Sequence, residues 1–85
     1  MKEEIEMIEA LRIIVKPYIQ DQEAFDNLKE ETDFISDLKI NSANLVDVIL
    51  DIEERFDIEI DNESMNTMLN VKVAIEVINT KISEK

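Results

Sequence analysis

Between Ser42 and Phe56, apolar residues recur every three or four positions, and this spacing constrains the fold more than any other feature of the sequence. Leu45, Ile49 and Ile52 fall on one face of a helix built over these residues. The remaining faces are largely acidic. The spacing therefore predicts an amphipathic helix over residues 42–56, with an apolar face packed on a core and a negatively charged outer surface.

A serine stands at the start of this predicted helix. The N-terminus of a helix carries unpaired backbone N–H groups and about half of a positive elementary charge, which suits a bound phosphate. Serine is also a favoured N-cap residue, so Ser42 has an ordinary structural reading as the cap. Asn44, followed three residues later by Asp47, forms a loose capping box that would start the helix two residues after Ser42.

Helical spacing also occurs before this run. It predicts a first helix over Lys2–Lys16, ended by Pro17, which has no backbone N–H to donate. Residues 20–33 form a long polar connection. Phe25 and Leu28, its large apolar residues, are expected to pin it to the core as a loop or a short helical turn.

The connections on either side of residues 42–56 are expected to return to the core. Thr32 or Asp33 would cap a brief turn before Ser42. After the helix, Asp57 would adopt the left-handed conformation of a C-terminal cap, because the chain contains no glycine. Ile58 and Ile60 alternate with acids and are predicted to point inward from an extended connection.

Two further helices follow this connection. Asp61 or Asn62 would begin a short third helix, and Asn70 would cap a fourth. The apolar residues expected to turn inward from the third helix are Met65, Met68 and Leu69. The predicted buried stripe of the fourth helix is Val71, Ala74, Ile75, Ile78 and Ile82. The sequence therefore predicts an all-α fold, a four-helix bundle with three longer helices, a short third helix and a long first loop, in one domain over residues 1–85.

The net charge of −12 at pH 7 limits the classes of partner. It argues against nucleic acid and against anionic membranes, since both are bound by basic residues. It favours proteins with basic patches. No apolar run is long enough to span a bilayer. The lack of cysteine fits a reducing compartment. The N-terminal stretch is too acidic for the first part of a signal peptide, and we expect a cytoplasmic protein.

Residue types that are missing from the chain exclude several chemistries. Without histidine and cysteine there is no Ser-His-Asp triad and no zinc site, and without glycine there is no phosphate-binding loop. A calcium loop that starts at Asp61 fails, because Asn66 and Lys72 hold the positions that need glycine and glutamate. The abundant carboxylates leave a carboxylate enzyme open as an alternative, but an acid/base pair would need a cleft, for which a four-helix domain of this size offers little room. We predict no catalytic residue and no metal site.

Taken together, the residues on both sides of Ser42 resemble the acyl carrier protein family. The approach matches at Phe34, Asp37 and Leu38, and Ser42 stands where the family carries its modified serine. The matching helix positions are Val46, Asp47, Leu50, Glu53, Glu54 and Phe56. The segments after that helix are also similar, so the resemblance covers nearly the whole chain.

The resemblance implies a carrier rather than an enzyme. It implies a 4'-phosphopantetheine group, moved from coenzyme A to Ser42 by a phosphopantetheinyl transferase, whose thiol carries acyl groups as thioesters. The pathway would be fatty-acid or related lipid or polyketide biosynthesis. The partners would be that transferase and acyl-transferring and chain-elongating enzymes with basic patches, and the chain would act as a monomer.

Two sets of residues are candidates for these roles. The residues expected to contact partners from the exposed side of the helix are Asn41, Asp47, Asp51, Glu53 and Glu54. The candidates for lining an acyl pocket are Val46, Leu50, Met65, Met68 and Leu69. For the methionines and Leu69, ordinary core packing is the competing interpretation.

The chain departs from the family pattern at three positions near the serine. Lys39 replaces a glycine, Asn41 replaces an aspartate and Ala43 replaces a leucine. These changes bear on which transferase recognises the chain, because they leave the Ser42 hydroxyl in place. The alternatives are a specialised carrier for amino-acyl, secondary-metabolite or cell-surface chemistry, and an unmodified acidic interaction module in which Ser42 is dispensable.

Overall fold

Residues 2–84 are described in the computed structural model of the chain, with their side chains from residue 6 onward. The elements are α1 (Lys2–Val15), the 3-10 turn η1 (Lys16–Tyr18), α2 (Gln22–Asp26), α3 (Ser42–Phe56), α4 (Asn62–Met65) and α5 (Val71–Ser83). Within these residues β pairing is limited to an isolated bridge between Asp33 and Asn70. The prediction of an all-α fold is confirmed.

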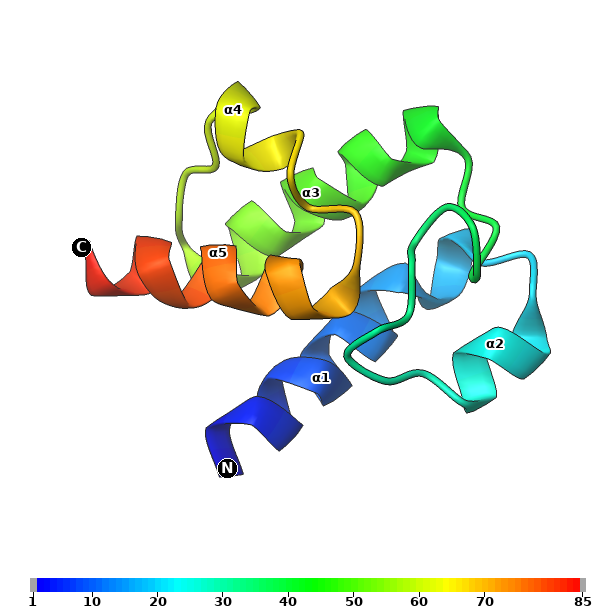
Figure 1. The fold of residues 1–85 in the computed structure, drawn as a ribbon. Coiled ribbons are helices and arrows are strands. Elements are labelled where there is room, and N and C mark those ends of the chain that lie inside the picture. Colours follow the sequence, from blue (N-terminus) through cyan, green and yellow to red (C-terminus); the bar gives the residue numbers. More distant parts are fainter. Residues whose placement is uncertain (1, 85) are drawn as a thin grey trace.

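The three long helices form the body of the molecule. The helix α1 packs against both α3 and α5. Figure 1 shows α4 at one side of these helices and α2 beside the C-terminal part of α1. The first helix ends at Val15, and Pro17 lies in the 3-10 turn that follows, so the predicted helix end at Lys16 is correct to within one residue.

The core is built from the inner faces of these helices and from the loops between them. Leu45, Ile49 and Ile52 of α3 are buried, as their spacing predicts. The connecting segments contribute Phe34, Leu38, Ile40, Ile58 and Ile60, which are all buried. The inward direction predicted for the isoleucines after α3 is therefore confirmed. A domain of this size relies on such loop residues because three helices alone enclose little apolar volume.

One predicted core residue of α5 is not buried. Val71, Ala74, Ile75 and Ile78 are buried, whereas Ile82 is 40% exposed. Figure 1 shows the C-terminal turn of α5 extending past the other helices. The prediction for Ile82 is wrong because its side chain lines a depression that is open to solvent, together with Met7 and Phe56, and stays partly uncovered there.

The polar connection after η1 contains a short helix. Asp21 caps α2 by accepting a hydrogen bond from the Ala24 N–H at 3.0 Å. The buried Phe25 ring lies under the Arg12 guanidinium at 4.6 Å, and Arg12 also donates to the Phe25 carbonyl oxygen at 3.1 Å. The cation–π contact and the hydrogen bond hold α2 on α1. Of the two structures left open by the sequence, the short helical turn is the one formed.

Both backbone reversals around α3 use residues with positive φ. Asp57 ends α3 at φ 54°, as predicted for a chain without glycine, and Lys39 precedes α3 at φ 61°. The left-handed conformation costs a residue with a Cβ atom about 1–2 kcal/mol. Lys39 stands where the family pattern has glycine, so this conformation explains why that position favours a residue without a side chain.

Candidate functional site

The cap of α3 is Asn41. Its side-chain oxygen accepts a hydrogen bond from the Ala43 N–H at 2.8 Å, and the helix begins at Ser42. The interpretation of Ser42 as N-cap is therefore wrong, and so is the capping box that would have started the helix later. Asparagine caps as well as serine does, and here it is one residue earlier with an extended backbone. Consequently Ser42 is not used in capping.

The Ser42 side chain is exposed in the first turn of α3. No residue in the described part of the chain, 2–84, forms a hydrogen bond with its hydroxyl. Asn41 and Ala43 are exposed on either side of it. The hydroxyl is therefore accessible to another protein and lies at the positive end of a helix dipole. Such an arrangement suits a serine that forms a phosphodiester with an external donor.

Ser42 lies in a stretch of sequence without acidic residues. Residues 38–46 include one base, Lys39, and no acid, in a chain whose net charge is −12. The Lys39 ammonium donates to the Ser36 carbonyl oxygen at 2.7 Å. A phosphate that approaches Ser42 therefore meets no carboxylate from the adjoining residues.

The five predicted recognition residues are not equivalent. Asn41, Asp47 and Glu54 are exposed. Asp51 and Glu53 are half-buried, so the expectation that the four acids lie on the exposed side of the helix is wrong for these two. Each of them has an intramolecular partner. For all five, a role in recognition stays a prediction.

Asp51 and Glu53 each accept a hydrogen bond that joins α3 to another segment: η1 for Asp51 and the α3–α4 connection for Glu53. The Tyr18 hydroxyl donates to Asp51 Oδ2 at 3.3 Å. Partial burial of Tyr18 and, secondarily, the Asp51 carboxylate raise the pKa of the Tyr18 hydroxyl above its ordinary value. At the other edge, Glu53 Oε2 accepts from the Ile60 N–H at 2.7 Å. Sequence reasoning missed both contacts because the partners are not neighbours on one helix face.

The predicted acyl-pocket residues do not form one lining. Val46, Leu50 and Leu69 are exposed by 44%, 52% and 48%, whereas Met68 is fully buried in the core and Met65 is half-buried. The expectation that Leu69 turns inward is wrong, because Leu69 lies beyond the end of α4 at Met65, in the connection to α5. There its carbonyl oxygen accepts a hydrogen bond from the Phe34 N–H, and its side chain is left exposed. For Met68, core packing is the interpretation that the structure supports.

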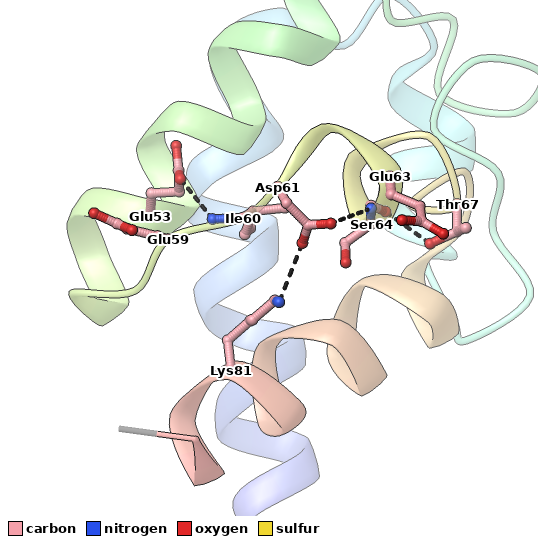
Figure 2. Close-up of a pocket in the computed structure, with 8 residues that line it drawn as sticks. All are labelled: Glu53, Glu59, Ile60, Asp61, Glu63, Ser64, Thr67 and Lys81. Carbon is pink, nitrogen blue, oxygen red and sulfur yellow. Dashed lines mark hydrogen bonds and ion pairs between the residues drawn. The ribbon is translucent and has the colours of Figure 1, made fainter.

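A depression of about 800 Å³ lies elsewhere, between the C-terminal half of α3, α4 and the end of α5. Figure 2 shows its lining residues, of which half are acidic: Glu53, Glu59, Ile60, Asp61, Glu63, Ser64, Thr67 and Lys81. None of the five acyl-pocket candidates lines it. Sequence reasoning missed this depression, since its walls come from three separate segments.

Lys81 is the base in this depression. Its ammonium lies 3.1 Å from Asp61 Oδ1 and 3.6 Å from Glu84 Oε1. Hydrogen bonding from Ser64 and then from Lys81 lowers the pKa of Asp61 to about 2. The same hydrogen bond with Asp61 raises the pKa of Lys81. Asp61 also begins α4, as predicted, so this ion pair joins the start of α4 to the last turn of α5.

The described residues contain neither a cluster of metal ligands nor a membrane-spanning helix. No group of three or more His, Cys, Asp or Glu side chains among residues 6–84 is arranged to hold a metal ion. Over the same residues, none of the helices combines the length and the apolar character needed to cross a bilayer.

Comparison with known proteins places the chain in a family. Two relatives named acyl carrier protein, from two strains of Nitratidesulfovibrio vulgaris, are each 36% identical over 69 residues, which is 79% of this chain and 91% of the relative. A third, named acyl carrier protein in a Sulfurovum species, is 36% identical over 53 residues, or 62% of this chain and 71% of the relative. No family model matches the chain.

The relatives share one name, and that name denotes a class of small carrier proteins. The chain belongs to the acyl carrier protein family. The predicted resemblance is therefore confirmed, and so is a carrier role at the level of the family.

Proposed function

We propose that this chain carries acyl groups as thioesters on a 4'-phosphopantetheine group attached to the Oγ atom of Ser42. The observation that carries this proposal is the exposed Ser42 hydroxyl in the first turn of α3, which no described residue engages. The family named by the relatives supports it.

The residues around Ser42 fit such a group. A phosphodiester keeps a negative charge, which the N-terminal end of a 15-residue helix stabilises. Asn41 caps the helix without adding a competing charge, and Ala43 leaves the approach to the hydroxyl uncovered. The flanking residues therefore accommodate the charge of the group.

Ser42 acts as the nucleophile in the attachment. Its Oγ forms the new bond to phosphorus as the bond from that phosphorus to the nucleotide part of coenzyme A breaks, and the serine proton passes to a base on the transferase. When bound, the group supplies a thiol that forms thioesters with acyl chains. The chain itself contributes a positioned hydroxyl and a surface that other enzymes bind.

The partners in this proposal are a phosphopantetheinyl transferase and acyl-transferring or chain-elongating enzymes. Exposed Asp47 and Glu54 on the outer face of α3 are suited to basic patches on them, together with Asn41 beside the serine. Asp51 and Glu53 add negative charge to the edges of the same face. We place this activity in fatty-acid or related lipid or polyketide biosynthesis in the cytoplasm.

Intact mass spectrometry tests the proposal. The chain is incubated with coenzyme A, magnesium and a broad-specificity phosphopantetheinyl transferase, beside Ser42→Ala and Ser36→Ala. Ser36 is the matched control, because it is an exposed serine in the segment that precedes α3. A single phosphopantetheine addition that is lost only in Ser42→Ala is expected. A folded wild-type chain that gains no mass with any transferase would overturn the proposal.

A further inference from the structure

The segment that leads to Ser42 is fastened to the start of α5. The Thr32 carbonyl oxygen accepts a hydrogen bond from the Val71 N–H at 3.0 Å, and the Phe34 N–H donates to the Leu69 carbonyl oxygen at 3.0 Å. Figure 1 shows this loop running past the N-terminal end of α5. The beginning of the approach to Ser42 is therefore held by an element that is distant in the sequence.

Asp33 lies between these two residues and forms hydrogen bonds throughout the turn that follows, at residues 35–38. Its Oδ1 atom accepts from the backbone N–H groups of Ile35 at 2.9 Å and Ser36 at 2.8 Å. Its carbonyl oxygen accepts from Asp37 and Leu38, both at 3.1 Å. Its own N–H donates to Asp37 Oδ2 at 2.7 Å. The conformation of this turn therefore depends on the Asp33 side chain.

The residues between this turn and Ser42 are held by burial and by hydrogen bonds. Leu38 is fully buried, and the Ile40 N–H donates to the Phe34 carbonyl oxygen at 3.0 Å. Only Asn41, itself held as the helix cap, separates Ile40 from Ser42. A change in the turn at residues 33–38 is thus transmitted along a short, hydrogen-bonded path to the first turn of α3.

We infer that Asp33 is a positioning residue for Ser42, which acts through the turn and not by contact with the serine. Its carboxylate holds the approach loop in the conformation that presents the Ser42 hydroxyl at a defined place relative to α5. Small misplacements of a reacting atom cost large factors in rate, so loss of this carboxylate slows the attachment step. The inference rests on the proposed function of Ser42.

Asp21 provides a matched control. Its side chain also accepts a backbone N–H, that of Ala24 at 3.0 Å, and also starts a helical turn. It caps α2, which Arg12 holds on α1. The neighbouring Gln20 N–H donates to the Leu38 carbonyl oxygen at 3.0 Å, but this bond joins two backbones and does not use the Asp21 side chain. Replacing either aspartate by alanine removes a local cap of the same kind, and each change is expected to lower stability. Only the change at Asp33 alters the presentation of Ser42.

The test compares phosphopantetheinylation kinetics of wild type, Asp33→Ala, Asp33→Asn and Asp21→Ala with one transferase. Sucrose is present throughout to favour the folded state, and urea titrations establish the folded fraction of each variant. Asp33→Ala is expected to lower kcat about tenfold and change KM less than about threefold, because a misplaced nucleophile slows chemistry more than binding. Asp33→Asn, which keeps a side-chain oxygen acceptor, should restore kcat to within about threefold of wild type, and Asp21→Ala should leave it unchanged.

The inference is overturned if Asp33→Ala and Asp21→Ala, each corrected for folded fraction, are modified at the same rate, or if Asp33→Asn is as slow as Asp33→Ala. Should Asp33→Ala not fold, Asp33→Ser replaces it. The serine hydroxyl is a shorter acceptor, so an intermediate rate is expected, and a rate equal to wild type counts against the inference.

A wild-type chain that is not modified rejects the proposed function, whereas a modified wild type with an unaffected Asp33→Ala rejects only the positioning role.

Discussion

The Glu53 carboxylate accepts a hydrogen bond from the backbone N–H of Ile60 at 2.7 Å, across the end of α3. Between the two residues the chain reverses at Asp57, which has φ 54°. Figure 2 shows this contact at the wall of the acidic depression. Because Ile60 is buried, its N–H has little access to water and needs a partner within the protein. Glu53 is therefore a structural residue of the α3–α4 connection.

Glu53→Ala is expected to lower the free energy of unfolding by about 1–3 kcal/mol, because it leaves the Ile60 N–H without its acceptor. The measurement is urea denaturation followed by circular dichroism. Glu54→Ala is the control, since Glu54 is the adjacent, exposed acid, and its effect should stay within about 0.5 kcal/mol. Equal losses in the two variants would show that the contact does not stabilise the connection.

Glu54→Lys is expected to reduce kcat/KM for phosphopantetheinylation about three- to tenfold at low salt, because it reverses a charge on the outer face of α3. The effect should shrink at about 0.5 M salt, at which exposed charges are screened. Glu76→Lys, at an exposed position of α5, makes the same change in net charge and serves as the control. Equal slowing by both variants would mean that net charge, rather than the face of α3, governs recognition.

The contact of Asp61 with Ser64 and Lys81 predicts a pH-dependent contribution to stability. The pKa of Asp61 is lowered from 3.8 to about 2 in the folded chain. Because the pKa of Asp61 is lower in the folded chain than in the unfolded chain, the ionised carboxylate stabilises the fold. This stabilisation is complete above the unfolded-state pKa of 3.8 and is lost as the pH falls through about 2. Urea titrations of wild type and Asp61→Asn should therefore differ at about pH 5 and converge at about pH 1.5.

Lys81→Met separates the two partners of Asp61. It should remove part of the wild-type advantage over Asp61→Asn at about pH 5, and leave the part that comes from Ser64, the larger cause of the lowered pKa. If wild type and Asp61→Asn differ in unfolding free energy by the same amount at about pH 5 and about pH 1.5, the pH dependence does not come from ionisation of Asp61.

Lys39→Gly is expected to raise the free energy of unfolding by about 0.5–1 kcal/mol, because it relieves a side chain held at φ 61°. Thermal denaturation of the two chains measures the change. Lys39→Ala is the control for the lost hydrogen bond to the Ser36 carbonyl oxygen, since it removes the ammonium but keeps the Cβ atom. If alanine stabilises as much as glycine does, the backbone conformation is not the reason.

The sequence predicted the elements of this fold that depend on residues close together in the chain. The helical face of Leu45, Ile49 and Ile52 is such an element, since three- and four-residue spacing places side chains on one side of any helix. The cap at Asn70 and the left-handed Asp57 are others, because they need only local chemistry. The cap of α3 was misassigned because Asn41 and Ser42 are adjacent and cap equally well.

The helical pattern, the negative charge and the family signature around Ser42 can be read from the sequence alone. The partners of the polar residues, such as Glu53 with Ile60 and Asp61 with Lys81, are visible only in the folded chain. The same holds for the position of Leu69 outside the core, which helical spacing does not show. The physical reason is that burial and long-range hydrogen bonds depend on which segments pack together, whereas periodicity and caps depend on the few residues within one turn.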